Sequence, residues 1–294
     1  MKCYLCKSEE FIELPGKVRD SESLKILECK NCSLVFLSDF SHIESAHYEK
    51  SGMHGSTPAP FEDWLKESEG DDERRFKFLK QKILNKSILD FGCGAGGFLY
   101  KSQTFAKECS GIELEQRALE RLKENGIHAK NSISAFIDSK SKFDLITAFH
   151  VVEHLPDPCS IITELSKLLN DTGELIIEVP NSNDALLKLY KSKPFSEFTY
   201  WSNHLFLFNN ETMKSLIKKS GLQLNWIKQI QRYPISNHLH WLSNGSPGGH
   251  VKWFFLDDQE LNAAYESKLS SLGLCDTIIL SVSKLIDKAE GDIN

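Results

Sequence analysis

The chain has 294 residues, of which 40% are hydrophobic and 26% charged, and its formal net charge is −6. This composition is typical of a soluble globular protein, and the length accommodates one domain of ordinary size plus a smaller module. The acidic balance argues against a protein that holds nucleic acid by its phosphates. No basic start leads into an apolar segment, and no apolar run approaches the ~18 residues that span a bilayer. We therefore expect a cytoplasmic protein without a membrane span, whose eight cysteines are reduced or bind metal.

Four cysteines near the start form two pairs with metal-binding spacing. Cys3 and Cys6 make one C-x2-C pair, and Cys29 and Cys32 make a second after 22 intervening residues. Two such pairs complete a tetrahedral four-thiolate zinc site, which has no open position for chemistry. The alternative is a thioredoxin-like redox pair, but no βαβ pattern surrounds either one. The spacing predicts a zinc ribbon over residues 1–40 with a structural Zn²⁺.

The ribbon is a weak candidate for a nucleic-acid reader. Residues 1–60 carry nine acidic and seven basic side chains, so they offer little attraction to phosphates. We expect the ribbon to pack on the larger domain and help to shape a substrate cleft. Residues 41–78 are interpreted as a linker and helical lid, in which Tyr48 could reach a bound ligand or lie in an ordinary surface connection. A helical pattern over 61–84 places charged side chains outside.

A glycine-rich stretch follows a short apolar run at residues 88–98 and predicts a strand, a tight loop and a helix start. Gly92, Gly94 and Gly97 match the G-x-G-x-x-G fingerprint of dinucleotide binding, a weak signal by itself. Asp90 would repel a pyrophosphate but suits the ammonium of an amino acid. This aspartate favours S-adenosylmethionine (SAM) over a dinucleotide.

Two later segments complete a recognisable order. Gly111-Ile-Glu113 ends a second strand with an acid, and Phe143–Leu155 joins an apolar strand to the sequence His-Val-Val-Glu-His-Leu. With the glycine loop, they resemble the class I SAM-dependent methyltransferases over roughly residues 79–221. The resemblance implies an α/β fold, a Rossmann-like seven-stranded, mostly parallel sandwich.

The resemblance also implies a set of cofactor contacts. Glu113 would accept hydrogen bonds from both ribose hydroxyls, although an acid capping the next helix would stand at the same place. Family members often carry an aspartate after the third strand to read adenine, where this chain has Asn131-Ser132-Ile133. The predicted cofactor-binding residues are Asp90, Gly92, Cys93, Gly94, Gly96, Phe98, Glu113, Leu114, Asn131, Ser132, Ile133, Phe149 and His150.

Three residues are candidates for acid–base work on the acceptor. Glu153 and His154 follow the fourth strand, where open α/β sheets bind ligands. They could transfer protons, or they could pin their loop and cap the next helix. His204 lies in an aromatic segment, residues 200–208, which resembles the acceptor-pocket segment of sugar- and small-molecule-modifying methyltransferases. It could act as a general base or be a buried histidine bonded to backbone.

The remaining residues complete the predicted organisation. Residues 79–225 would form the SAM-binding domain and 226–294 a helical acceptor region, in which Arg232, Tyr233 and Trp241 could contact the substrate. We expect methyl transfer to a nucleotide-linked or glycan-linked sugar, on oxygen or carbon. The alternatives are an RNA methyltransferase that reads through the ribbon and a non-catalytic SAM-fold scaffold. The oligomeric state is open.

Overall fold

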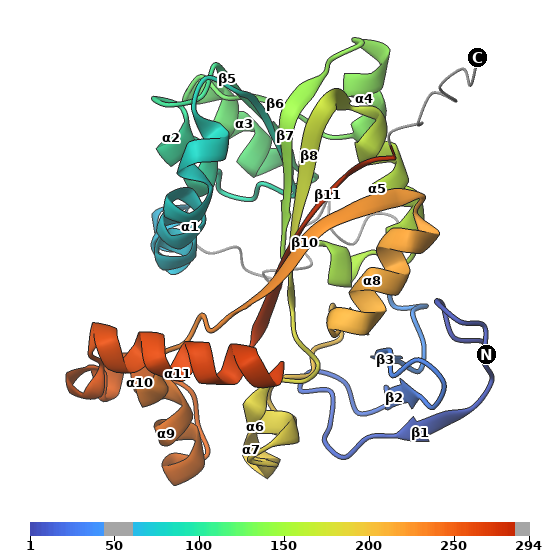
Figure 1. Cartoon of the computed structure of the whole chain (residues 1–294), viewed down its shortest axis with the longest axis vertical. Coiled ribbons are helices and arrows are strands. Elements are labelled where there is room, and N and C mark those ends of the chain that lie inside the picture. Colours follow the sequence, from blue (N-terminus) through green and yellow to red (C-terminus); the bar gives the residue numbers. More distant parts are fainter. Residues whose placement is uncertain (44–60, 286–294) are drawn as a thin grey trace, which may run out of the picture.

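The structure is a computed structural model that describes residues 1–43 and 61–285 (Figure 1). Its centre is a seven-stranded sheet. The strands, in spatial order, are β10 (Leu222–Ile230), β11 (Thr277–Lys284), β8 (Leu169–Pro180), β7 (Phe143–Phe149), β4 (Ser87–Phe91), β5 (Glu108–Ile112) and β6 (His128–Lys130). Strands β6, β5, β4, β7 and β8 are parallel, whereas β11 runs antiparallel to both β8 and β10. The predicted fold class, α/β with seven mostly parallel strands, is confirmed.

Helices cover both faces of this sheet (Figure 1). One face packs on α1 (Phe61–Ile83), α2 (Gly97–Ser102) and α3 (Gln116–Glu124), and the other on α4 (Ile133–Asp138), α5 (Pro158–Lys167) and α8 (Asn210–Lys219). Successive residues of β4 alternate between the two cores, with Ile88 in one apolar cluster and Leu89 in the other. Because both faces are covered, β7 needs apolar residues almost throughout, which explains its Phe-Asp-Leu-Ile-Thr-Ala-Phe sequence.

The N-terminal residues form a second, smaller sheet. Its strands are β1 (Phe11–Glu13), β2 (Ile26–Cys29), β3 (Val35–Leu37) and β9 (Phe206–Leu207), in that spatial order. The last strand belongs to the region after the central β8 and pairs antiparallel with β3. The ribbon also shares one continuous apolar core with the central sheet. The ribbon is therefore packed against the larger domain, as expected from the sequence.

A helical insertion separates the last two strands of the central sheet. It contains α9 (Ile235–Asn244), α10 (Gly249–Lys252), the 3₁₀ turn η2 (Phe254–Leu256) and α11 (Gln259–Leu272). The expected boundary at residue 225 is wrong, because it falls inside β10, and β11 lies within the supposed acceptor region. Residues 277–284 form a largely buried strand between β8 and β10, so the separate unit is only about 231–276.

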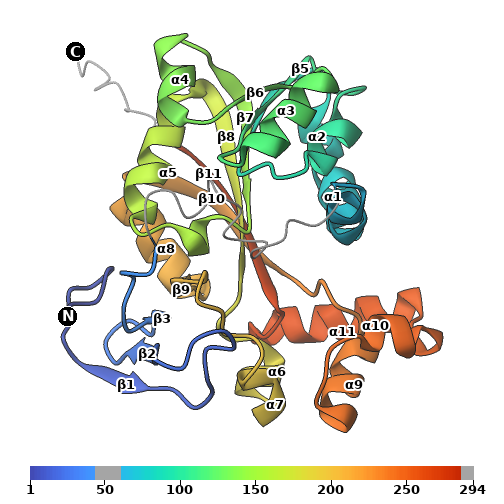
Figure 2. The same ribbon diagram turned by 180° about the vertical axis from the view of Figure 1, so that it is seen from behind.

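The ribbon and the insertion both lie at the end of the sheet where β8 ends (Figure 2). Short helices α6 (Ala185–Lys188) and α7 (Lys193–Ser196) follow β8 at that end, and the 3₁₀ turn η1 (Val152–His154) follows β7. Since β8 and β7 are parallel, this is the carboxyl end of the parallel strands. Among the described residues, no helix is long and apolar enough to cross a membrane. Tyr48, the proposed lid contact, lies outside the described residues.

Candidate active site

The glycine loop joins β4 to α2 at the carboxyl end of the sheet. Gly92 adopts φ 70°, a left-handed conformation that side chains rarely occupy. A Cβ at Gly92 would also collide with the side chain of Val151, which follows β7. The loop therefore passes close to the end of β7 because position 92 lacks a side chain.

Asp90 lies buried beneath this loop, with 4% of its surface exposed. The hydroxyl of Thr147, on the neighbouring β7, donates to Oδ1 at 2.6 Å. Burial raises the pKa of Asp90 to about 7, and the nearby Asp72 and Glu113 add to the rise. A cationic partner would therefore help to ionise this carboxyl group.

Glu113, at the end of β5, faces the same loop. Its Oε2 accepts the backbone N–H of Gly94 at 2.8 Å, and Oε1 accepts those of Leu114 and Glu115 at 2.7 and 3.0 Å. Asp90 of β4 pairs in register with Gly111 of β5. This pairing brings Asp90 and Glu113 to the same end of the sheet. The structure brings Asp90, the glycine loop and Glu113, all predicted cofactor contacts, together at the carboxyl end of the sheet.

The other predicted cofactor contacts lie around this end of the sheet, but the side chain of Phe98 is buried. Asn131 follows β6, and Ser132 caps α4 by accepting the N–H of Ala135 at 3.4 Å, ahead of the buried Ile133. Cys93 is buried and Leu114 is 40% exposed. Phe98 is 2% exposed and packs its ring on Phe149 at 5.1 Å, so only its backbone is available to a ligand.

A cluster of charged side chains behind the end of β7 was not predicted from the sequence. The fully buried Glu178, on β8, accepts two hydrogen bonds from Arg74 at 2.9 Å and two from Arg75 at 2.8 and 3.0 Å. His150 Nε2 lies 3.2 Å from the same carboxylate. Burial opposes ionisation, but Arg75 and its cationic neighbours hold the pKa of Glu178 well below its usual range.

Two expectations about charged side chains are thereby corrected. Helix α1 does not place all its charges outside, because Asp72 and Arg75 are 5% and 8% exposed. The run Asp-Asp-Glu-Arg-Arg within an otherwise amphipathic helix was the available signal. Arg232 is engaged by Asp71 of α1 and Trp241 is 3% exposed, so neither is a free substrate contact.

Glu153, His154 and His204 converge, although 50 residues separate the two histidines. The rings of His154 and His204 have centroids 4.9 Å apart, and one ligand atom from each of the three residues lies within 4.8 Å of the others. His154 Nδ1 donates to the carbonyl of Asn203 at 2.7 Å, and Glu153 Oε1 lies 3.2 Å from His150 Nδ1. The loop-pinning role is therefore present, while Asp157 caps α5 instead.

Burial controls protonation in this cluster. It lowers the pKa of His204 to about 3, with a contribution from His154. Burial also opposes the charge on Glu153, but His150 and His154 outweigh it and lower the pKa of Glu153 to about 2. Near neutral pH the cluster holds neutral His204 and anionic Glu153. A histidine with so low a pKa is a weak base, so His204 by itself is poorly matched to deprotonating a hydroxyl.

The four ribbon cysteines come together as their spacing predicts. Cys3 Sγ lies 3.5 Å from Cys32 Sγ, and Cys6 Sγ lies 3.5 Å from Cys29 Sγ. All four sulfurs lie within 4.8 Å of one another, and no disulfide joins them. Tetrahedral zinc with Zn–S bonds of about 2.3 Å places its sulfurs about 3.8 Å apart, so the donor set fits zinc.

The ribbon holds the loops that carry the Glu153–His154–His204 cluster. The hydroxyl of Tyr4, within the first cysteine pair, bonds to Asp157 and accepts the N–H of Cys159 at 3.0 Å. Asp20 accepts the N–H and hydroxyl of Ser202 at 2.9 and 2.7 Å, next to the loop of His204. The ribbon thus contacts the loops on both sides of the Glu153–His154–His204 cluster.

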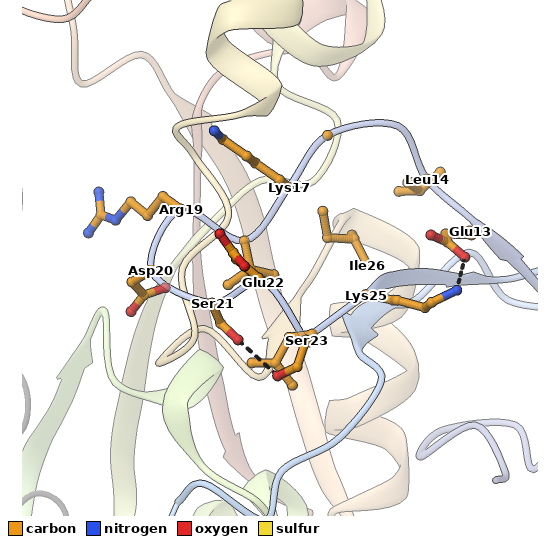
Figure 3. A pocket seen from close by; sticks show the side chains of 13 residues that line it. Glu13, Leu14, Lys17, Arg19, Asp20, Ser21, Glu22, Ser23, Lys25 and Ile26 are labelled. Atoms are coloured by element: carbon orange, nitrogen blue, oxygen red, sulfur yellow. Dashed lines mark hydrogen bonds and ion pairs between the residues drawn. The ribbon is translucent and has the colours of Figure 1, made fainter.

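A hollow lies in the loop between β1 and β2 (Figure 3). The pair formed by Lys25 and Glu13 borders one end, and Arg19 and Asp20 lie at the other. The guanidinium of Arg19 stacks over the ring of Trp201 at 4.9 Å, and that ring lies 5.5 Å from His204. The Arg19 end of the hollow adjoins the histidine cluster through Trp201.

Comparisons with known proteins identify the family of this chain. A family model described as a methyltransferase domain matches residues 69–225, more than half of the chain, and the chain belongs to that family. It is a SAM-dependent methyltransferase.

The relatives share moderate similarity. The ubiquinone biosynthesis O-methyltransferase of Hydrogenovibrio crunogenus is 24% identical over 233 residues, covering 71% of this chain and 91% of that protein. The protein of the same name from Actinobacillus pleuropneumoniae is 32% identical over 123 residues, covering 36% of this chain and 52% of its own length. Other relatives of that name are also matched over about half their length.

One solved structure has a similar fold. The plantazolicin methyltransferase BamL, in complex with S-adenosylhomocysteine, superposes with a TM-score of 0.50 at 17% identity. The match covers 80% of this chain and 94% of that one.

Proposed function

We propose that this methyltransferase acts on a hydroxyl group of a small polar acceptor, a nucleotide-linked or glycan-linked sugar. Carbon methylation of the same acceptor is the variant reaction. The observation that carries the proposal is the position of Arg19 and Trp201 beside the cluster of Glu153, His154 and His204. An aromatic face can stack on a base or sugar, and an arginine fork suits a phosphate.

Arg19 is available for this role. Its side chain is exposed, and it forms no ion pair within the part of the chain that the structure describes. A nucleoside diphosphate sugar could present phosphate to Arg19 and a sugar hydroxyl to the histidine cluster. The relatives named as ubiquinone biosynthesis O-methyltransferases favour oxygen as the methylated atom. They also support a second candidate acceptor, a phenolic hydroxyl.

The cofactor would bind across the ends of β4, β5, β6 and β7. We assign the ammonium of SAM to Asp90, its ribose hydroxyls to Glu113, and its adenine to the Asn131–Ile133 edge. The backbone of Gly92–Phe98 and the residues Phe149 and His150 would line the methionine portion. To bind the ribose, Glu113 would exchange some of its present backbone hydrogen bonds for the diol. Reaction follows when the acceptor oxygen is held in line with the sulfonium methyl, since most of the rate gain comes from that orientation.

The ribbon in this proposal is structural. Cys3, Cys6, Cys29 and Cys32 would hold Zn²⁺, and the metal would stabilise the loops that Tyr4 and Asp20 contact. Reduced thiols and a thiolate metal site suit a cytoplasmic protein. We propose no nucleic-acid partner, because the chain has a net charge of −6 and offers little attraction to phosphates. Binding of nucleic acid with a steep salt dependence in a filter assay would contradict this.

Calorimetric titration of nucleoside diphosphate sugars into the complex with S-adenosylhomocysteine tests the acceptor. We expect binding by wild type and about tenfold weaker binding by Arg19→Gln, with binding of S-adenosylhomocysteine unchanged. Lys17→Gln removes a positive charge from the same hollow and should have a smaller effect. If no nucleotide sugar binds while a phenol is methylated, the phenolic candidate replaces the sugar.

A further inference from the structure

The outer end of the insertion carries an exposed apolar surface. Val251, Phe254 and Phe255 are 67%, 67% and 70% exposed, and Leu256 is 37% exposed. We call these four side chains the apolar tip. Figures 1 and 2 show α10, which contains Val251, at the outer end of the insertion, on the side away from the ribbon. Single exposed apolar residues are ordinary, but a cluster of them marks a place where another molecule binds.

The backbone that carries the apolar tip is held in place by contacts with α9. The ring of Trp253 packs on that of His240, with centroids 5.0 Å apart, and anchors the segment. At its end, the carboxylate of Asp257 accepts the hydroxyl of Ser236 at 2.7 Å. Gly249 lets α10 approach α9 closely, since a Cβ there would lie 2.5 Å from the carbonyl oxygen of Ser236. A preorganised surface of this kind loses little conformational entropy on binding.

The area of the apolar tip suits a protein interface of ordinary size. With about 200 Å² for a whole phenylalanine side chain, Phe254 and Phe255 expose about 270 Å², and Val251 and Leu256 raise the total to about 400 Å². A standard interface buries about 800 Å² on each partner, of which roughly 56–58% is apolar, or about 450 Å². The tip would therefore supply nearly all of the apolar part, and the polar residues beside it would supply the rim.

The charges beside the apolar tip distinguish between its possible partners. Lys252 lies near the beginning of the segment, and Glu260 follows its end in the first turn of α11. Both are exposed, and neither forms an ion pair with a residue that the structure describes. Asp257 and Asp258 add to the acidic side, so the segment lacks the Lys/Arg cluster that an anionic lipid surface attracts. Opposite charges that begin and end one segment are self-complementary, because a two-fold axis can place Lys252 of one copy against Glu260 of the other.

We propose that the apolar tip is the interface of a symmetric dimer, in which each copy covers the tip of the other. The two segments run antiparallel across the two-fold axis, with Phe254 and Phe255 of both copies at the centre. Pairs of Lys252 and Glu260 lie at the rim. Buried aromatic side chains at the centre supply most of the binding energy of such an interface, and the charged rim fixes its register. This interface does not depend on the identity of the methyl acceptor.

Sedimentation velocity of the full zinc-loaded chain, over a range of concentrations, tests the interface. We expect a concentration-dependent dimer in wild type and at least tenfold weaker dimerisation in Phe255→Asp. Leu272→Asp is the matched control, because Leu272 is also exposed on the insertion but lies at the opposite end of α11. This control should dimerise as wild type does. A monomeric wild type, or equal dimerisation by Phe255→Asp, would overturn the proposal.

An exchange of charges tests the two-fold arrangement while leaving the apolar surface intact. Lys252→Glu and Glu260→Lys should each weaken dimerisation about two- to fivefold, as exposed ion pairs do, and the double variant should recover it. Unchanged single variants, or a double variant as weak as either one, would refute the antiparallel arrangement.

Flotation with vesicles of phosphatidylcholine, with and without phosphatidylglycerol, distinguishes the other occupant of the tip. We expect no flotation of wild type with either kind of vesicle. Flotation that Phe255→Asp abolishes and Leu272→Asp retains would assign the apolar tip to a lipid surface and overturn the dimer.

Discussion

Binding of S-adenosylhomocysteine should weaken as the pH falls below 7, because of Asp90. Burial raises the pKa of this carboxyl to about 7, with help from Asp72 and Glu113, so it is about half protonated at pH 7 in the ligand-free protein. The ligand's ammonium requires the ionised form. Binding at lower pH must therefore expel a proton from Asp90, and the cost of that ionisation is subtracted from the affinity.

The size of the effect follows from the pKa. Below pH 7 each unit adds one decade to the protonated-to-ionised ratio, so the dissociation constant should rise about fivefold from pH 7 to 6 and about ninefold from pH 6 to 5. Between pH 7 and pH 5 the expected weakening is about 50-fold, or ~2.3 kcal/mol. Above pH 8 the carboxyl is ionised in both states, and this contribution to the pH dependence vanishes.

Calorimetry from pH 5 to 8, in two buffers of different ionisation enthalpy, measures both the affinity and the protons released. Asp90→Asn should bind more weakly at pH 8 and lose the slope. Glu113→Gln should also bind weakly but keep the slope, since Asp90 is intact. Equal dissociation constants at pH 5 and 7, or a slope that survives in Asp90→Asn, would refute the assignment of Asp90 to the ammonium.

Three further predictions concern stability. Glu178→Gln should lower the free energy of unfolding by about 3–5 kcal/mol in denaturant titration, because Arg74 and Arg75 lose their buried counter-charge; a loss below ~1 kcal/mol would contradict this. Gly92→Ala should destabilise more than Gly126→Ala in thermal melts, since both positions have positive φ but only a Cβ at 92 meets a neighbour; equal losses would exclude the collision with Val151. Cys29→Ser should release zinc and expose the amides of residues 1–43 to hydrogen exchange, since zinc binding can supply about 10–16 kcal/mol of folding free energy, whereas Cys109→Ser should leave both unchanged.

The sequence was sufficient for features that depend on neighbouring residues. The glycines of the loop lie within a few residues of one another, and the left-handed backbone of Gly92 is a local requirement. The cysteine pairs likewise predict a knuckle from spacing alone. The apolar run of β7 indicated a central strand because burial on both faces leaves no place for alternation.

Other features were predicted only in part. His204 was recognised as chemically interesting from its aromatic neighbours, but only the fold brings it close to Glu153 and His154. The last two strands were divided by a wrong boundary, because a helical insertion separates β10 from β11 in the sequence while hydrogen bonds join them in the sheet.

The sequence by itself thus determined the glycine loop, the acids at the ends of β4 and β5, and the four-cysteine set, since each is specified within a few neighbouring residues. Only the tertiary structure decided which charged side chains are buried together and which histidines meet. Glu178 and Arg75 are 103 residues apart, and their charges are tolerated in the interior only because the fold brings them within hydrogen-bonding distance. Such pairings depend on how distant elements pack, and no local pattern encodes that packing.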